Sequence, residues 1–352
     1  MEKQYRSAYV LGKFMPFHNG HIHLIDTAIS KSDKVTVVVG TLPTEPIPGE
    51  LRFKWVKEHY RTNPNVTVVH CTEVLPQYPE EHVDFWKIWV GVVNRYCPAD
   101  IDVIFTSELY GETYAQHLGI EHHLVDLERK IIPTSGTKIR NKPFDMWDTL
   151  PHHVRPYFVK RIAIMGCESC GKSTLTRYLA EHYNTNYVEE YGRTVYENNG
   201  GFVTVQDFKI ISDGRQLIEN AMIKQSNKLL FVDTEDITTS VFLTMYHPHT
   251  PYLTAKYLNK QELADWWELV NVEDYLKDQI KIKPNYDLYI LLTPDCQAVQ
   301  DGTRKFLDTR KDHHIRIKAE LIAKKCNFVE IGGTWTNRFE QAKKVINKEY
   351  NI

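Results

Sequence analysis

Two loops in this sequence combine glycine with basic or imidazole side chains at spacings that suit phosphate binding. The first loop runs from Gly12 to His21 and follows the apolar residues 9–11. The second runs from Gly166 to Ser173 and follows the apolar run 161–165. Each loop precedes a predicted helix, whose first N–H groups are free to meet an anion. The sequence therefore predicts two nucleotide sites, each with its own ATP-dependent chemistry.

The first loop places two histidines one turn apart at the start of a predicted helix. Because His18 and His21 are three residues apart, both rings lie on one side of that turn, beside the positive end of the helix dipole. Gly12 and Gly20 lack a Cβ and permit close approach to an anion. We interpret the loop as a triphosphate cradle rather than a metal site, since no third ligand stands at a suitable spacing. Further candidates in the loop are Lys13 and Phe14.

A second motif, Ser135 to Arg140, follows about 115 residues later. Ser135 and Thr137 can hold phosphate oxygens at a helix start, and Arg140 adds positive charge. Alone, Ser-Gly-Thr predicts only a capping turn. Together and in this order, the two motifs resemble those of the nucleotidyltransferase superfamily, which adenylylates small molecules from ATP.

This resemblance implies that the acceptor's phosphate attacks the α-phosphorus of ATP directly, so positioning and charge stabilisation provide the catalysis. His18 and His21 would face the phosphates, while Lys13, Arg140 and Mg²⁺ would neutralise developing charge. Segments 47–55, 105–108 and 125–129 look like those of nicotinamide-nucleotide adenylyltransferases. The resemblance makes three residues candidates for binding the acceptor: Arg52 for its phosphate, and Trp86 or Trp89 for its ring, although two Trp at this spacing also suit a buried core.

The second loop fits the P-loop pattern Gly-x4-Gly-Lys-Ser. In that pattern N–H groups wrap the β-phosphate, Lys172 reaches the β- and γ-phosphates, and Ser173 binds Mg²⁺. Asp233 ends the apolar run 228–232 and is predicted beside the magnesium. The pattern's other candidates for ATP binding are Gly166, Gly171 and Thr174.

A kinase must also surround the transferred phosphoryl group with positive charge and exclude water. The stretch 301–304, ending in Arg304 and followed by Arg310, is the predicted lid, with an exposed turn bearing a solvated charge pair as the alternative.

Two further stretches, 189–193 and 233–239, surround the predicted kinase site. With the first half, they make residues 5–345 resemble the bifunctional nicotinamide-nucleotide adenylyltransferase and ribosylnicotinamide kinase family. The resemblance implies that the second half phosphorylates nicotinamide riboside and the first half adenylylates the resulting mononucleotide to NAD. It assigns the riboside side of the kinase pocket to Glu190, Tyr191, Arg193, Asp233 and Asp236, since carboxylates suit ribose hydroxyls. The segment 294–302 lacks the Pro-Trp expected in this family's lid.

Two other functions stay open. The same two chemistries could act on pantetheine phosphate and dephospho-coenzyme A, although the aromatic and acidic residues near 190 and 233 argue against this. Alternatively, the chain is an ATP sensor without catalysis, which the intact Lys172, Ser173, His18, His21 and Arg140 disfavour.

The elements that must position these residues alternate between short β-branched runs and helical patterns. The alternation over 352 residues predicts an α/β protein with two doubly wound parallel-sheet domains, 1–155 and 156–352. Breaker-rich residues 141–156 separate them. The predicted strands are 7–11, 34–39, 65–70, 102–105 and 122–125 in the first half, and 161–165, 186–189, 228–232, 286–292 and 327–331 in the second.

Composition limits the partners. A net charge of −2 predicts no nucleic-acid partner, and a first strand within about ten residues of Met1 leaves no room for the helix-turn-helix of some relatives. No apolar run approaches the ~18 residues that span a bilayer, and six scattered cysteines form no disulfide-like framework. We therefore expect a cytoplasmic enzyme whose partners are ATP, nicotinamide riboside and its mononucleotide. Formation of a homo-oligomer is left open.

Overall fold

The computed structural model describes residues 3–97, 100–247, 259–282, 286–300 and 307–352. The chain divides into two compact units, Met1–Tyr157 and Phe158–Ile352. This division falls two residues after the predicted boundary. Among the described residues, every helix is too short or too polar to cross a lipid bilayer.

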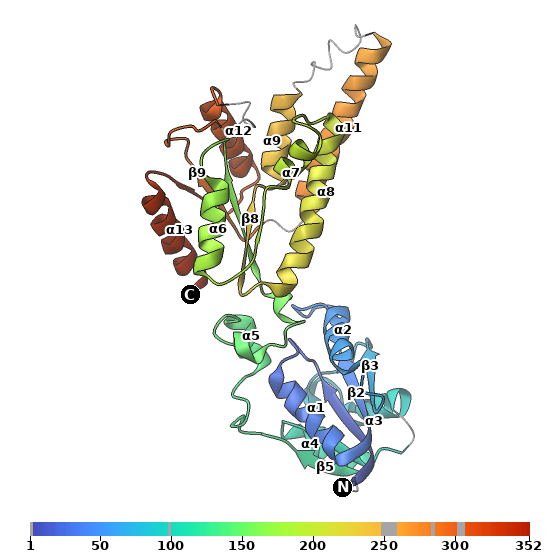
Figure 1. The fold of residues 1–352 in the computed structure, drawn as a ribbon. Helices are drawn as coiled ribbons and strands as arrows, with labels where there is room; N and C mark the ends of the chain where they lie inside the picture. Colours follow the sequence, from blue (N-terminus) through green and yellow to red (C-terminus); the bar gives the residue numbers. More distant parts are fainter. Residues whose placement is uncertain (1–2, 98–99, 248–258, 283–285, 301–306) are drawn as a thin grey trace. The chain divides into compact units, whose positions relative to one another are not determined.

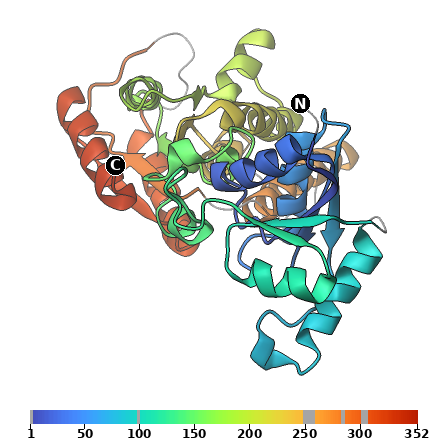
Figure 2. The same ribbon diagram turned by 90° about the horizontal axis from the view of Figure 1, so that it is seen from below.

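The first unit is built on a five-stranded parallel sheet of order β3-β2-β1-β4-β5. Tyr9, Ile104 and Tyr114 belong to its core. Helices cover both faces; Figure 2 shows the dark blue α1 on one side of the strands and the teal α4 on the other. The strands are β1 (Tyr5–Gly12), β2 (Ser32–Gly40), β3 (Val66–Cys71), β4 (Val103–Thr106) and β5 (Glu121–Leu124). The helices are α1 (Asn19–Lys31), α2 (Gly49–Tyr60), α3 (Phe85–Tyr96), α4 (Tyr110–Leu118) and α5 (Gly136–Asn141).

The second unit repeats the architecture with the strand order β10-β9-β6-β8-β7, again parallel throughout. Its strands are β6 (Lys160–Gly166), β7 (Tyr187–Val188), β8 (Leu229–Asp233), β9 (Leu288–Leu292) and β10 (Phe328–Ile331). Helices α8, α9 and α11 lie side by side in this unit (Figure 1). Its helices are α6 (Lys172–His182), α7 (Tyr191–Asn198), α8 (Val205–Met222), α9 (Asp236–Tyr246), α11 (Lys260–Ile282), α12 (Arg310–Ala323) and α13 (Trp335–Tyr350).

Strand order decides where each site lies. In the first sheet β1 lies between β2 and β4, and in the second sheet β6 lies between β9 and β8. In each sheet the other strands are therefore added on both sides of one central strand. Ligands of open α/β sheets bind at the carboxyl ends of strands at such switch points. Both predicted phosphate loops follow these two strands. The predicted fold class is confirmed, and each predicted strand overlaps an observed one.

Candidate active sites

The first loop turns sharply after β1. Phe14 adopts a positive φ of 47° and is buried, and its ring packs over Gly12. A Cβ added to Gly12 would lie 3.0 Å from that ring, and one added to Gly20 would lie 2.9 Å from the ring of His18. Both predicted glycines are therefore needed for the close packing of this loop.

The two predicted histidines lie together at the start of α1. His18 is the N-cap, and its Nδ1 accepts a hydrogen bond of 3.1 Å from the backbone N–H of Gly20. The His18 and His21 rings stack with centroids 3.7 Å apart. Burial, assisted by the charge of Arg129, lowers the pKa of His18 to about 3, and burial also lowers the pKa of His21 well below its ordinary value. Neutral His18 must then carry its proton on Nε2, where it can donate to an oxygen.

Arg129 is a member of this site that the sequence reasoning missed. Its charge helps to lower the pKa of both His18 and His21. It has a positive φ of 52° in a turn where the Asp126 carboxylate accepts three backbone N–H bonds. The Asp-x-x-Arg spacing in the segment 125–129 is the sequence signal that could have singled it out.

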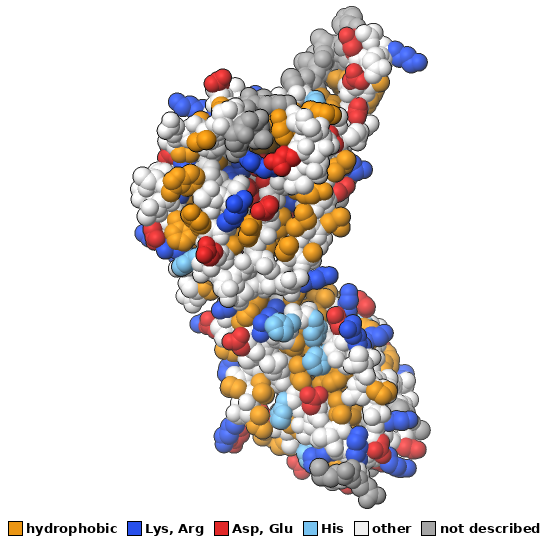
Figure 3. All heavy atoms as spheres, in the orientation of Figure 1, with side chains coloured by type: hydrophobic (Ala, Val, Ile, Leu, Met, Phe, Trp, Pro, Cys, Tyr) orange, Lys and Arg blue, Asp and Glu red, His pale blue; other side chains and the backbone are white. Residues whose placement is uncertain are grey.

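Aromatic contacts extend the site beyond the two predicted histidines. Phe17 stacks parallel to His21 and also contacts His59 and His153. Figure 3 shows several histidine side chains, in pale blue, close together on one part of the first unit. The described residues hold no group of three or more candidate ligands placed to bind a metal ion.

The second motif packs directly on the first loop. Ser135 is the N-cap of α5, and its hydroxyl accepts a 3.2 Å bond from the Lys138 N–H. Arg140 donates to the Met15 carbonyl at 2.5 Å and to the Thr137 hydroxyl at 3.2 Å. A Cβ on Gly136 would lie 2.5 Å from the same carbonyl, so only glycine allows this approach. The fold thus brings two motifs together that are far apart in sequence.

Two predicted residues have other partners. The ammonium group of Lys13 pairs with Glu45 at 3.0 Å. Arg52 is fully buried and donates to the carbonyls of Ile47 (3.0 Å) and Lys13 (2.6 Å) and to Glu45. In this structure Arg52 therefore links two loops through three protein acceptors, and its contact with the acceptor's phosphate stays a prediction.

The two tryptophans of α3 take part in core packing. Trp86 stacks on His117 with centroids 5.3 Å apart, and Trp89 donates its indole N–H to the Pro76 carbonyl at 3.0 Å. Both rings pack against the buried cluster that contains Tyr114. This arrangement agrees with the core alternative rather than with ring stacking on a ligand.

In the second unit, the P-loop leaves β6 through two glycines with positive φ. Gly166 has φ 146° and Gly171 has φ 87°. A Cβ on Gly171 would lie 1.8 Å from the Trp335 ring. Lys172 begins α6, is buried, and donates to the Cys167 carbonyl at 3.2 Å. Burial alone lowers its pKa, but nearby negative groups, Glu190 first, outweigh burial and raise it, so the ammonium stays charged.

Asp233 lies at the carboxyl end of β8 and is 1 % exposed. Its Oδ1 accepts from the Thr234 hydroxyl at 3.3 Å, and the nearby Ser173 hydroxyl acts to lower its pKa. Burial, followed by the charge of Glu190, raises the pKa of Asp233 to about 6. Its Oδ2 is buried and has no hydrogen-bond partner among the described residues.

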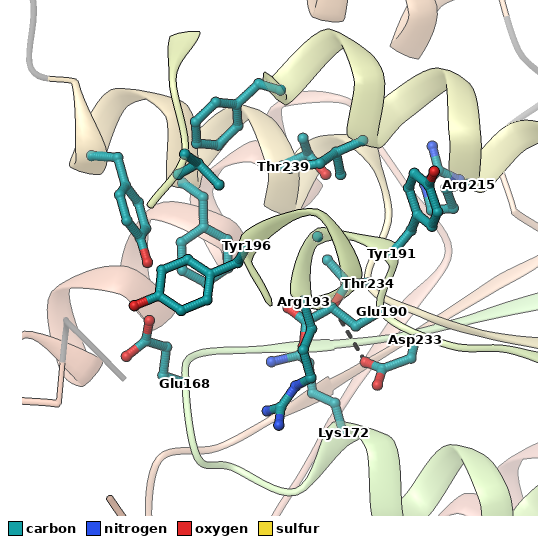
Figure 4. Close-up of a pocket in the computed structure, with 16 residues that line it drawn as sticks. Glu168, Lys172, Glu190, Tyr191, Arg193, Tyr196, Arg215, Asp233, Thr234 and Thr239 are labelled. Atoms are coloured by element: carbon teal, nitrogen blue, oxygen red, sulfur yellow. Dashed lines mark hydrogen bonds between the residues drawn. The ribbon is translucent and has the colours of Figure 1, made fainter. Parts of the chain in front are cut away.

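Two cavities meet at these residues. One encloses about 990 Å³, open solvent included, and is lined by Ser169, Ser173, Thr174 and other P-loop residues. The other encloses about 780 Å³ by the same measure, and five aromatic side chains line it together with charged and polar groups; we call it the aromatic cavity. Figure 4 shows the lining of the second cavity. The residues that line both cavities are Lys172, Glu190, Arg193 and Asp233. A group transferred from one cavity to the other would pass this junction.

The second cavity also has lining residues that the sequence reasoning missed. Arg215, Phe208 and Ile211 come from one face of α8, and their spacing of three and four residues is the signal that could have found them. Predicted Asp236 pairs with Arg215 at 2.6 Å and accepts from Ser212 at 2.7 Å. Arg215 lines the cavity, and Asp236 holds it in place. Predicted Tyr191 also lines it.

Arg310 holds the P-loop from outside. The first residue of α12, it donates to the carbonyls of Glu168 (3.0 Å), Ser169 (3.3 Å) and Cys296 (3.0 Å). It is buried, so it acts on the loop's backbone in this structure. The other predicted lid residue, Arg304, lies outside the described residues.

Comparison with known proteins finds a matching family for each of the two units. A family described as Cytidylyltransferase-like matches residues 9–142, and one described as AAA domain matches residues 161–338. The trifunctional NAD biosynthesis/regulator protein NadR of Escherichia coli (strain K12) is 33% identical over 322 residues, covering 84% of this chain and 70% of that protein. The NadR of Salmonella typhimurium (strain LT2) is 32% identical over 86% of this chain and 72% of that protein.

A crystal structure of a NadR protein in complex with NR has the same fold, with a TM-score of 0.80 at 20% identity over 100% of this chain and 98% of that one. Fold and site together define a two-domain transferase that joins a nucleotidyltransferase to a P-loop kinase. The chain belongs to the NadR family of NAD biosynthesis proteins.

Proposed function

We propose that the second unit transfers the γ-phosphoryl group of ATP to the 5′-hydroxyl of nicotinamide riboside. The first unit then transfers the adenylyl group of a second ATP to the resulting nicotinamide mononucleotide, giving NAD and pyrophosphate. The observation that carries this proposal is the junction of an aromatic cavity with the P-loop cavity. The NAD biosynthesis relatives and a related fold seen with NR support the choice of substrate.

In the kinase, the four side chains at the junction have different roles. The Lys172 ammonium binds phosphate oxygens, and Arg193 neutralises charge on the group in transfer. Asp233, with a pKa of about 6, is mostly ionised at neutral pH and accepts a hydrogen bond from the attacking hydroxyl. Glu190 holds a ribose hydroxyl.

The residues present fit a magnesium ion. The buried Oδ2 of Asp233 has no partner among the described residues, and the Ser173 hydroxyl lies beside the same carboxylate. Oxygen ligands of this kind suit Mg²⁺, which when bound would neutralise phosphate charge. We propose Ser173 and Asp233 as its protein ligands. Chelation with EDTA should abolish phosphoryl transfer, and excess Mg²⁺ should restore it; transfer that persists in EDTA would contradict this assignment.

In the adenylyltransferase, neutral imidazoles donate hydrogen bonds to the phosphates. His18 carries its free proton on Nε2, and His21 has a buried Nδ1 without a partner among the described residues, which a bound phosphate oxygen or water would satisfy. The charges of Arg140 and Arg129 complete the cradle. Its catalysis is orientation and charge stabilisation, with no covalent intermediate.

The experiment that tests this function is chromatography of reactions with ATP and Mg²⁺. The protein should convert nicotinamide riboside to NAD and should adenylylate the mononucleotide, but should leave pantetheine phosphate and dephospho-coenzyme A unchanged. Turnover of those two compounds would favour the coenzyme A alternative. Tight ATP binding without any turnover would favour the sensor. The cytoplasmic location and the lack of a nucleic-acid partner stay predictions.

A further inference from the structure

We propose that Glu45 is a positioning residue, which holds the ammonium group of Lys13 in place for adenylyl transfer in the first unit. The inference rests on the proposed adenylyltransferase function and names a residue that acts through Lys13. Glu45 lies in the loop 41–48, which joins β2 to α2 and contains three prolines. Because each proline fixes its own φ, this loop has little conformational freedom.

Lys13 is held at both ends by Glu45 and Arg52. Its Nζ lies 3.0 Å from Oε1 of Glu45, and its backbone carbonyl accepts a 2.6 Å hydrogen bond from Nη1 of Arg52. Arg52 also pairs with Oε2 of Glu45. We call these three mutual contacts the Lys13 clasp. Because both ends of Lys13 have a partner, the direction of its side chain is fixed.

The Lys13 clasp is anchored within its own unit. Arg52 is fully buried on α2 and donates to the Ile47 carbonyl at 3.0 Å. The Glu45 side chain is 8 % exposed, and its Oε2 accepts a 2.9 Å bond from the Leu42 N–H. Burial alone raises the pKa of Glu45, but the Leu42 N–H and the two cations of the clasp outweigh burial and lower it. The carboxylate therefore stays ionised and keeps its hold on Lys13.

The Lys13 clasp lies beside the phosphate loop of the first unit. Lys13 follows Gly12, the last residue of β1, and precedes Phe14, whose ring centroid lies 4.9 Å from that of His21. The Lys13 side chain is 47 % exposed, so a ligand can reach its ammonium group. An ammonium has three N–H donors, and pairing with Glu45 leaves others for phosphate oxygens.

A lysine fixed in advance stabilises developing charge better than a mobile one. Lys13 loses its rotamer freedom on folding, so little remains to be lost when charge develops on the phosphates. Protein kinases use a comparable Lys–Glu ion pair, which must be in place for phosphoryl transfer. Glu45 therefore needs no contact of its own with ATP or the mononucleotide.

The test is a double-mutant cycle on the adenylylation of nicotinamide mononucleotide. Glu45→Gln keeps an oxygen for Arg52 but removes the charge that holds Lys13. Its kcat should fall at least about tenfold, while KM for the mononucleotide changes by less than about threefold, because the interaction acts in the transition state. In the Lys13→Ala background the same substitution should change kcat by less than about twofold. Glu45→Asp keeps the charge, so its kcat should exceed that of the Gln variant.

Two controls accompany the cycle. The kinase rate of each variant should equal that of the wild type. Glu73→Gln breaks another ion pair of the first unit, with Arg95, and should leave kcat unchanged. Circular dichroism checks folding. If Glu45→Gln does not fold, the cycle is run with Glu45→Asp, whose kcat loss should likewise be smaller in the Lys13→Ala background.

Three results would overturn the inference. Equal losses in the wild-type and Lys13→Ala backgrounds would show that Glu45 only braces the loop. A higher kcat in Glu45→Gln would show that the carboxylate holds Lys13 away from ATP. An Asp variant as slow as the Gln variant would show that the charge is not what matters. A wild type that leaves the mononucleotide unchanged would instead refute the proposed adenylyltransferase function.

Discussion

The principal side chains of the two sites are all buried, but they differ in charge because their neighbours differ. His18 and His21 are buried without a nearby carboxylate that shifts them, so their pKa values fall and both rings stay neutral. Lys172 is equally buried, but Glu190 and other negative groups raise its pKa. One site therefore offers neutral hydrogen-bond donors and the other a fixed cation, as adenylyl and phosphoryl transfer at different phosphates require.

Acid should destabilise the first unit through His18. Its folded-state pKa of about 3 lies below the ordinary 6.5, so the folded state binds fewer protons between these values. The stabilisation is complete above about pH 6.5 and is lost as the pH falls towards 3, by up to about 1.4 kcal/mol per pH unit. Asn in place of His18 keeps the N-cap acceptor but cannot titrate.

Urea unfolding measured at about pH 7.5 and about pH 5 tests this prediction. The free energy of unfolding should fall by about 1–2 kcal/mol more in the wild type than in His18→Asn. Equal losses in both proteins would mean that the ring is not held neutral.

Substitutions at two glycines of the second unit distinguish the effect of a steric clash from that of backbone strain alone. Gly171→Ala places a methyl group 1.8 Å from the Trp335 ring at a φ of 87°, so the P-loop or the ring packed on it must move. The kinase rate should fall at least about 100-fold, roughly 2.7 kcal/mol, while adenylyl transfer is retained. Gly200→Ala is the control: its φ of 71° adds strain of about 1 kcal/mol, but nothing lies within 4 Å. Similar kinase rates in the two variants would contradict the packing argument.

Two helices hold the P-loop between them. Arg310 of α12 binds the carbonyls of Glu168 and Ser169, and Arg338 of α13 binds the carbonyl of Cys170 at 2.5 Å. Each guanidinium holds its carbonyls outward, and because a peptide's N–H points opposite to its C=O, the N–H groups turn inward. The helices thus shape a phosphate nest in advance.

Substitution of Arg310 tests this role of the helices. Arg310→Ala should raise the dissociation constant for ATP at least about tenfold, about 1.4 kcal/mol. Arg310→Lys should not restore it, because one ammonium cannot replace a planar group that reaches three carbonyls. Nucleotide titration measures both. Full rescue by Lys would mean that Arg310 acts as a simple charge.

The elements were the most predictable part of the fold. Runs such as Val35 to Val39 are apolar because parallel strands are covered on both faces, so each predicted strand overlaps an observed one. The order of the strands could not be predicted, since crossover handedness and packing decide it.

Site residues inside motifs were more predictable than those outside. Lys172, Glu190, Arg193 and Asp233 follow strand ends, and the structure brings them to one junction. Arg215 was missed because it contributes to the cavity through the packing of α8 rather than through a loop. The burial of Arg52 could not be predicted, because the sequence does not show whether a positive charge near a phosphate site is buried.

At the level of the whole chain, each unit has its own sheet, core and site. Polypeptides 1–157 and 158–352 should therefore fold separately, the first with adenylyltransferase and the second with kinase activity. Cooperative thermal unfolding and activity of each piece check this prediction. A piece that folds but lacks its activity would show that its site needs the other unit.

The central claim is that one chain carries two consecutive and separable reactions. The most direct test is a chromatographic time course of nicotinamide riboside with ATP and Mg²⁺ in the wild type, Lys172→Ala and His18→Ala. The wild type should form NAD. Lys172→Ala should make no mononucleotide yet convert supplied mononucleotide to NAD, whereas His18→Ala should accumulate mononucleotide. If Lys172→Ala also fails to convert supplied mononucleotide, or the wild type leaves the riboside unchanged, the two-site account is wrong.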